Sequence, residues 1–275
     1  MTQPLPSNPI HADSVIPSLR KVALITGAAK RIGRHIALEM AKQGWDVVVH
    51  FGTSTNEAAE VVADIAAMGQ RAVAIQADLA DEAATRALFS TAISAMGAVH
   101  CVVNNASLFA EDKPSSFSLA SLDQHMHANL AAPVILAQAL HAATPDGEQA
   151  CVINLLDQKL YNLNPDFLSY TLSKAALQCA TTMLAQALAP KVRVVGIAPG
   201  ITLVSGHQSE ADFNVAHQAT PLGYSSSPQD IARSVLFLAN SPAMTGTTIL
   251  VDGGQHLIPL QRDVMFVATA TESHS

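Results

Sequence analysis

The pair Tyr170 and Lys174 offers the clearest chemistry in this sequence. If the segment is helical, a phenol and an ammonium four residues apart project from one helix face. A lysine near a phenol lowers the phenol pKa, so that proton transfer becomes feasible near neutral pH. The spacing alone is a common accident, and its weight depends on where the pair lies in the fold.

A second candidate site is the run Thr26-Gly27-Ala28-Ala29-Lys30-Arg31-Ile32-Gly33-Arg34, which follows an apolar run and opens a helical one. Glycine permits a tight turn and a close approach of backbone to a ligand. The free N–H groups and the positive dipole end of a helix N-terminus bind phosphate. The run therefore predicts a pyrophosphate site, and its place between the first strand and the first helix strengthens that prediction.

The elements that must position these residues alternate along the chain. The apolar, β-branched runs are nearly continuous, as expected for parallel strands covered on both faces. They lie at 21–26, 46–51, 72–76, 99–104, 150–155, 192–197 and 247–251. Stretches with helical spacing lie between them, at 33–43, 56–68, 81–96, 119–143, 168–188 and 228–239. This alternation predicts an α/β fold, a doubly wound open sheet of seven parallel strands that binds its ligand beyond the carboxyl ends of the strands.

The rest of the chain divides into three segments. Residues 1–20 contain four prolines and are expected to form a flexible leader, and residues 21–258 form a single domain. Residues 259–275 are expected to form a tail, whose apolar stretch 264–267 is a candidate for packing on another subunit. The segment 205–227 is too long for an ordinary connection and follows a strand, so it is predicted to be a loop that covers the substrate.

Composition excludes several classes of protein. With 275 residues, 49% hydrophobic and 13% charged, the chain is not disordered in bulk, and its net charge of −7 argues against a nucleic-acid partner. No run approaches the roughly 18–20 apolar residues that span a bilayer, and the N-terminus does not resemble a signal peptide, so we expect a cytoplasmic protein. Three cysteines without C-x-x-C spacing are expected to be buried apolar side chains, and the scattered histidines predict no metal site.

The glycine turn resembles the T-G-x-x-x-G-x-G turn of the short-chain dehydrogenase/reductase family, with Arg31 in place of the middle glycine. That substitution is similar to the pteridine reductases within the family, in which the arginine touches both cofactor phosphate and pterin. The run Asn104-Asn105-Ala106, Pro199-Gly200 and Val251-Asp252-Gly253-Gly254 match other family motifs. The resemblance extends from Lys21 to Leu257 and implies a Rossmann-like fold.

By this resemblance Tyr170 and Lys174 belong to the active site, and Lys174 also holds the nicotinamide ribose. Asn129 would anchor a water of the proton relay. Most family members place a serine thirteen residues before the tyrosine, where this chain has Asp157, an exchange that pteridine reductases share. Reducing a C=N bond requires a proton on nitrogen, which a carboxyl group with a raised pKa can deliver. Alternatively, Asp157 only caps the following loop.

The resemblance also assigns substrate and cofactor residues. Arg31, Ser107 and Phe109 align with residues that contact the pterin, and the Phe109 ring would stack the heterocycle against the nicotinamide. The second strand ends without the acidic residue that binds the 2′-hydroxyl of NAD, so NADPH is expected. The expected cofactor residues are Gly27, Lys30, Arg31, Ile32, Gly33, His50, Thr53, Ser54, Asp78, Leu79, Asn105, Ala106, Ser107, Tyr170, Lys174, Pro199 and Gly200.

The resulting expectation is an NADPH-dependent pteridine reductase that acts on dihydrobiopterin, dihydromonapterin or dihydrofolate. The alternative is a carbonyl reductase of the same family, acting on ketones or 3-oxoacyl thioesters. A non-catalytic dinucleotide sensor is a third possibility, which the intact Asn129, Tyr170 and Lys174 disfavour. By resemblance the protein forms a homotetramer through the helical stretches 119–143 and 168–188.

Overall fold

The computed structural model describes residues 20–205 and 208–266, and within them a single sheet of seven parallel strands. The strand order β3-β2-β1-β4-β5-β6-β7 confirms the predicted doubly wound, Rossmann-like fold. The strands are β1 Val22–Ile25, β2 Asp46–Phe51, β3 Ala72–Gln76, β4 Cys101–Asn104, β5 Ala150–Leu155, β6 Val192–Pro199 and β7 Thr248–Val251. The expected leader, apart from its last residue, lies outside the described residues.

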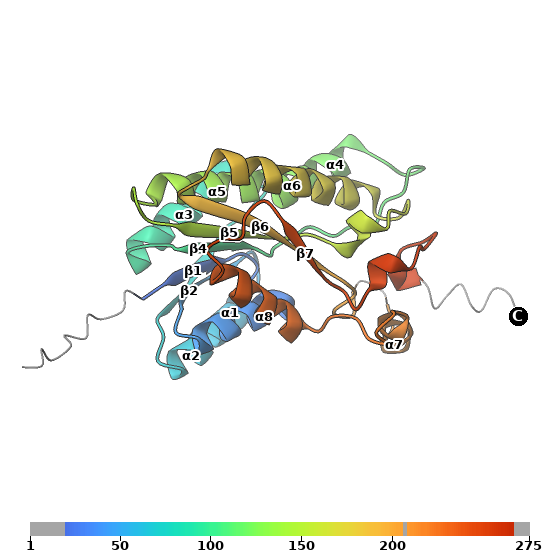
Figure 1. The fold of residues 1–275 in the computed structure, drawn as a ribbon, viewed down its shortest axis with the longest axis horizontal. Coiled ribbons are helices and arrows are strands. Elements are labelled where there is room, and N and C mark those ends of the chain that lie inside the picture. The colour runs from blue at the N-terminus through green and yellow to red at the C-terminus, as the bar shows by residue number, and fades with distance from the viewer. Residues whose placement is uncertain (1–19, 206–207, 267–275) are drawn as a thin grey trace, which may run out of the picture.

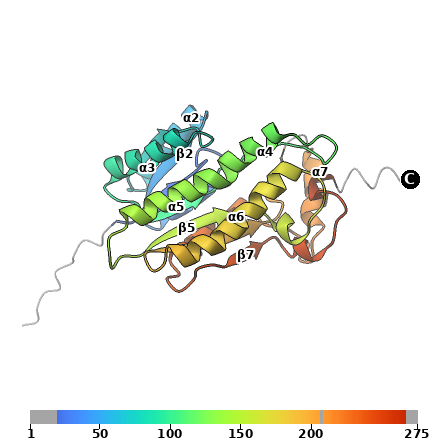
Figure 2. The ribbon, with the colours of Figure 1, turned by 90° about the horizontal axis from the view of Figure 1, so that it is seen from above.

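Helices cover both faces of the sheet (Figure 1). They are α1 Arg31–Lys42, α2 Thr55–Ala67, α3 Glu82–Met96, α4 Leu119–Met126, α5 Ala132–Ala143, α6 Leu168–Ala187, α7 Glu210–Gln218 and α8 Pro228–Ala239. Helices α1, α2 and α8 pack on one face, and α3, α5 and α6 pack on the other, where Figure 2 shows them from above. Alternate residues of each strand enter the two cores, as Ala23 and Leu24 do, which is why the strands are apolar throughout.

Two predicted elements differ in detail from the structure. The helical stretch 119–143 contains a π-helical turn at His127–Ala131, which separates α4 from α5 and carries Asn129. The segment 205–227, predicted as a loop, contains the nine-residue helix α7. Ser209 caps this helix by accepting a hydrogen bond from the backbone N–H of Asp212.

The cysteine prediction is wrong at one position. Cys101 and Cys151 are buried and face each other on β4 and β5, but Cys179 is exposed on α6. Helix α6 is amphipathic, and position 179 lies on the side that points away from the sheet. No helix among the described residues is long and apolar enough to cross a membrane.

The carboxyl ends of the central strands are tied together by polar side chains. Asn104 ends β4 and donates a hydrogen bond of 2.8 Å to the side-chain oxygen of Asn154 on β5, which in turn donates to the Thr181 hydroxyl of α6 at 2.9 Å. All three side chains are buried. Because buried amides are costly unless paired, this chain of bonds fixes α6, and with it the Tyr170 side, relative to the sheet.

Candidate active site

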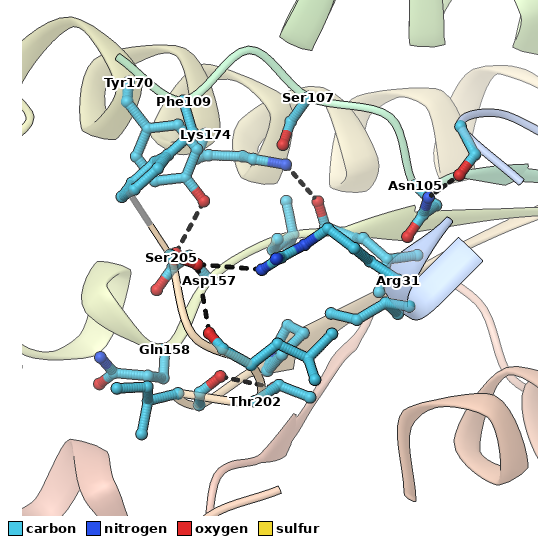
Figure 3. Close-up of a pocket in the computed structure, with 18 of the residues that line it drawn as sticks. Arg31, Asn105, Ser107, Phe109, Asp157, Gln158, Tyr170, Lys174, Thr202 and Ser205 are labelled. Atoms are coloured by element: carbon cyan, nitrogen blue, oxygen red, sulfur yellow. Dashed lines mark hydrogen bonds between the residues drawn. The ribbon is translucent and has the colours of Figure 1, made fainter. Parts of the chain in front are cut away.

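A cavity of about 570 Å³ opens where the loops after β1, β4, β5 and β6 converge (Figure 3). This is the edge of the sheet at which the sequence predicts the site. Its walls include Arg31 from the first loop, Phe109 from the loop after β4, and Asp157 with Tyr170 from the segment between β5 and α6. The structure therefore brings together residues that are up to about 140 positions apart in the chain, as a doubly wound topology requires.

Asp157 contacts Tyr170 directly. The Tyr170 hydroxyl donates a hydrogen bond of 2.7 Å to Oδ2 of Asp157, and the backbone N–H of Lys159 donates one of 2.8 Å to Oδ1. The carboxyl group thus caps the short 3₁₀ helix Gln158–Tyr161 and also faces the phenol. The carboxyl group therefore caps the following loop, as one interpretation predicts, and also contacts the phenol, as its role in proton delivery would require.

The ionisation of this group is governed by burial. Burial raises the pKa of Asp157, and the hydrogen bonds from Lys159 and Tyr170 offset part of that rise. Burial also raises the pKa of the Tyr170 phenol well above its usual range, and the nearby carboxylate raises it further. The expectation that Lys174 lowers the phenol pKa is thus wrong in this structure, because the phenol is a buried donor to a carboxylate. Tyr170 keeps its proton at neutral pH.

Lys174 lies on the face of α6 that carries Tyr170, as the four-residue spacing predicts. Its Nζ donates a hydrogen bond of 2.7 Å to the carbonyl oxygen of Leu155, at the end of β5. Burial lowers the pKa of Lys174 to about 8, against the opposing effect of the Asp157 carboxylate. The ammonium is therefore charged at neutral pH, and it has two further N–H groups for a ligand.

Asn129 does not line this cavity, and its side chain is saturated by protein partners. Its Oδ1 accepts from the backbone N–H of Leu108 at 2.7 Å, while Nδ2 donates to the Leu108 carbonyl at 2.9 Å and to the Ser173 hydroxyl at 3.0 Å. The hydroxyl of Ser173 in turn donates to the carbonyl of Tyr170. Asn129 therefore joins the loop after β4 to the helix that carries Tyr170, a positioning task.

Arg31 has a left-handed backbone conformation, which glycine adopts readily. Its φ is +52°, in the left-handed region that costs a non-glycine residue roughly 1 kcal/mol or more. The guanidinium donates to the carbonyl of Val204 at 2.9 Å and to the hydroxyl of Ser205 at 3.1 Å. Strain of this kind persists mainly at functional sites. Arg31 thus connects the glycine turn with the segment after β6, across the cavity.

Phe109 presents an aromatic wall. Its ring stacks on Phe167 at 4.3 Å between centroids and 18° between planes, and it meets the Tyr170 ring edge-on at 4.7 Å. The side chain remains 40% exposed and lines the cavity. Phe167 itself has a φ of +53° at the start of α6. The arrangement offers one flat apolar surface beside the Asp157–Tyr170 pair.

The glycine turn is built for close approach. A Cβ at Gly33 would lie 2.1 Å from the carbonyl oxygen of Gly27, so only glycine fits there. The side chain of Asn105 donates to the carbonyls of Thr26 and Gly27, which holds the loops after β1 and β4 together. A second cavity of about 620 Å³ shares Gly27, Ala106 and Ser107 with the first and reaches Thr53, Asp78 and Leu79. Two adjoining cavities over a helix N-terminus fit an elongated dinucleotide.

Of the expected site residues, all but Ser54 and Asn129 line one of these two cavities. Ser54 precedes α2 without capping it. Asp78 does not cap α3, a task that Asp81 performs, but accepts from the backbone N–H of Ala80 within its own loop.

His50 is among the expected cofactor residues, but its ring offers no positive charge to a phosphate. The ring is buried, its Nδ1 accepts from the backbone N–H of Gly27 at 3.1 Å, and its Nε2 lies 3.1 Å from the carbonyl of Ala77. Burial lowers its pKa, so the imidazole is neutral and brings no positive charge. Lys30 is one of the cations near the turn, and it pairs with Glu57 at 2.6 Å.

Several lining residues were not identified from the sequence. Gln158, Ser205 and Gln208 lie on the cavity wall. Gln158 directly follows Asp157, and the other two fall in the segment predicted to cover the substrate, so a signal existed for each.

The described part of the expected tail also lines the cavity, through Asp263, Val264 and Met265. Lys159 is buried, and its Nζ donates to Asp263 at 2.9 Å and to the Asp166 carbonyl. Arg262 pairs with the Asp166 carboxylate at 2.7 Å. Residues 263–265 of the expected tail therefore line the candidate site. Nothing in the local sequence indicates these pairs, because their members are about 100 positions apart.

The family described as short chain dehydrogenase matches residues 21–214. The chain belongs to the short-chain dehydrogenase family. Within this family, the structure of FolM alternative dihydrofolate reductase 1 from Brucella canis, complexed with NADP, superposes with a TM-score of 0.82 at 39% identity, covering 86% of this chain and 95% of that one.

Relatives with other names are also similar to this short-chain dehydrogenase. The 3-oxoacyl-[acyl-carrier-protein] reductase FabG of Staphylococcus aureus strain Mu50 is 31% identical over 247 residues, covering 87% of this chain and 99% of its own. The structure of angucycline C-6 ketoreductase LanV with bound NADP has a TM-score of 0.79 at 30% identity, covering 86% of this chain and 96% of that one. These similarities support the family assignment. The names of the relatives describe reductases that act on different chemical groups.

Proposed function

We propose that this short-chain oxidoreductase is an NADPH-dependent pteridine reductase, which reduces the pyrazine-ring C=N bond of a dihydropterin to the tetrahydro form. The observation that carries the proposal is the partly buried Asp157 carboxyl, hydrogen-bonded to the Tyr170 hydroxyl, where a carbonyl reductase of the family has a serine. The similarity to FolM alternative dihydrofolate reductase 1, a protein named for a pteridine substrate, supports the same substrate class.

The cofactor proposal rests on the residues around the glycine turn. The N-terminus of α1 and the close approach at Gly33 suit a pyrophosphate, and the end of β2 carries Thr53 and no carboxylate to repel a 2′-phosphate. Lys30 is the nearby cation. When bound, the nicotinamide supplies the hydride that reaches the carbon of the C=N bond.

The chain's own residues handle the proton. Because its pKa is raised, the Asp157 carboxyl holds a proton more readily than an exposed one and can give it to the imine nitrogen as the carbon is reduced. The Tyr170 hydroxyl, which donates to Oδ2, can then return a proton to the carboxylate and regain one from solvent. Lys174 orients the ribose with its free N–H groups, and Arg31 with Phe109 holds the flat ring.

Measuring NADPH oxidation with dihydropterins, dihydrofolate and simple ketones tests the proposal. Dihydropterin turnover is expected, with loss of about 10–1000-fold in Asp157→Ser, the range typical of removing a general acid. Turnover of ketones with no reaction of dihydropterins would instead support the carbonyl reductase.

We also propose a homotetramer, supported by the exposed apolar side chains of Leu172 and Met183 on α6.

A further inference from the structure

Two glutamine side chains on the wall of the cavity hold polar atoms without partners. They are Oε1 of Gln158 and both Oε1 and Nε2 of Gln208, which account for three of the six such buried atoms in the part of the chain that the structure describes. A buried polar atom is costly unless it is hydrogen-bonded, so each one requires an explanation. Because these atoms gather around one cavity, a ligand is the missing partner that they point to.

Gln158 is held in place by its neighbours. It begins the 3₁₀ helix that Asp157 caps, and it is only 7% exposed. The next residue, Lys159, is anchored to Asp263 and to the Asp166 carbonyl. The backbone that carries this amide is therefore fixed on both sides, and Figure 3 draws its side chain among those that line the cavity.

Gln208 comes from a different wall. It follows the segment that Arg31 holds through Val204 and Ser205, and the backbone N–H of Gln208 donates to the Ser205 carbonyl at 3.1 Å. A carboxamide offers a donor and an acceptor side by side. Two such groups from two walls suit a ligand part that is both donor and acceptor, as hydroxyl groups are.

The position of Gln158 next to Asp157 decides which part of the substrate these amides meet. If Asp157 protonates the pyrazine-ring nitrogen, then Gln158 lies at the pyrazine end, where dihydropterins carry their substituent on the neighbouring carbon, C6. We propose that Gln158 and Gln208 are specificity-determining residues that hydrogen-bond hydroxyl groups of this C6 substituent. The inference rests on the proposed function, and it adds the part of the substrate that the site distinguishes.

The test compares two substrates and two near-isosteric variants, Gln158→Met and Gln208→Met. One substrate is a 7,8-dihydropterin with a trihydroxypropyl group at C6, and the other is 6-methyl-7,8-dihydropterin, which lacks the hydroxyls. We expect each variant to lower kcat/KM for the hydroxylated substrate about 3–30-fold, mainly through KM, and to change that for the 6-methyl substrate less than about 2-fold.

Thermal unfolding without ligand provides a second readout. Removing an unpartnered buried amide should leave Tm unchanged or raise it, whereas Gln255→Met, the matched control, should lower Tm. Gln255 is a buried glutamine outside both cavities; its Nε2 also has no partner, but its Oε1 accepts from the Ile201 backbone N–H at 2.9 Å, and that bond is lost in the Met variant.

Three results would each overturn the inference. They are equal losses of kcat/KM on both substrates, a fall in Tm like that of the control, and an unchanged kcat/KM for the hydroxylated substrate in both variants. These results leave the proposed function intact as long as the unsubstituted protein reduces both dihydropterins. If the unsubstituted protein reduces neither, the proposed function fails and the inference fails with it.

Discussion

At the scale of single residues, the site is defined by an acid in an apolar setting. Tyr170 and Lys174 are buried and Asp157 is partly buried, and desolvation moves each pKa toward the neutral form of its group. Arg31 adds backbone strain at the glycine turn. Buried ionisable groups and strained backbone of this kind reduce the free energy of unfolding. Variants at these positions therefore separate the effect on stability from the effect on activity.

Asp157→Asn is expected to raise Tm at pH 7 while lowering dihydropterin turnover. Burial raises the Asp157 pKa, so the folded state binds this proton more tightly than the unfolded state. Stability therefore falls as the pH rises from below the unfolded pKa, and the full cost is present above the folded pKa. Removing the charge should raise Tm by about 2–4 °C, the shift that 1 kcal/mol gives in a domain of this size. The gain should vanish near pH 3.

Asp230→Asn serves as the control of opposite sign. Hydrogen bonds from Ser227 lower the Asp230 pKa, so its contribution is present above the unfolded pKa and lost as the pH falls. This variant should lower Tm at pH 7. A parallel response of the two variants would contradict the assignment of burial as the cause at Asp157.

Glu57→Gln is expected to strengthen NADPH binding. The carboxylate of Glu57 holds Lys30 at 2.6 Å, and releasing it leaves the ammonium free for the 2′-phosphate. Both side chains are substantially exposed, so KM for NADPH should fall only about 2–3-fold, with KM for NADH unchanged. Lys30→Ala should raise KM for NADPH alone. Equal changes for the two cofactors would place the Lys30 charge away from the 2′-phosphate.

At the scale of elements, the segment 258–266 closes one side of the cavity. It lies beside α7 at the same end of the molecule (Figure 1) and is joined to the site through Lys159–Asp263 and Arg262–Asp166. Lys159 is 2% exposed, so its ammonium depends on these partners. The same lysine supplies the backbone N–H that binds Asp157. The wall of the pocket and the acid within it thus share one anchor.

Lys159→Met is expected to cost about 3–5 kcal/mol of unfolding free energy, because it leaves the Asp263 carboxylate without its partner in a largely buried place. KM for the dihydropterin should also rise, since Asp263, Val264 and Met265 line the cavity. Denaturant unfolding and steady-state kinetics measure the two effects. Lys191→Met, which breaks the exposed pair with Asp146, should change stability by less than about 1 kcal/mol. Equal costs in the two variants would argue against a special role for the buried pair.

At the scale of the whole molecule, α6 presents apolar side chains outward. Leu172, Cys179 and Met183 are exposed and lie on one stripe of the helix, seven and four residues apart. The opposite side of α6 carries Tyr170 and Lys174, both buried. Assembly through this stripe would hold the helix that carries Tyr170 and Lys174 between the sheet and a neighbouring subunit.

Met183→Glu is expected to convert the proposed tetramer into smaller species, because it places a charge in a desolvated contact. Light scattering coupled to size-exclusion chromatography measures the mass. Ala83→Glu adds the same charge at an exposed position of α3 and should leave the assembly intact. A uniform monomer in the unsubstituted protein would contradict the tetramer.

Most of the sheet can be predicted from the sequence, because strands buried on both faces appear there as continuous apolar runs. Helix α7 was missed although Ser209 and Asp212 form a recognisable helix start. The π-helical turn around Asn129 and the pair Lys159–Asp263 could not be predicted, since both depend on packing between distant segments. The contact between Asp157 and Tyr170 was expected from the family, but the raised phenol pKa depends on burial, which spacing does not reveal.

The buried His50 has a consequence for how the protein tolerates acid. Only an unprotonated Nδ1 can accept the Gly27 N–H, so the turn is closed by a neutral ring. Because the folded pKa of His50 is lowered, this contribution is fully present above the value of a free imidazole, about 6.5, and is lost as the pH falls below that value through the folded pKa. Acidification should thus weaken binding of the dinucleotide while the central strands remain folded. The lower pH limit of activity would then be set by loss of the dinucleotide. The upper pH limit would be set by deprotonation of the proton donor.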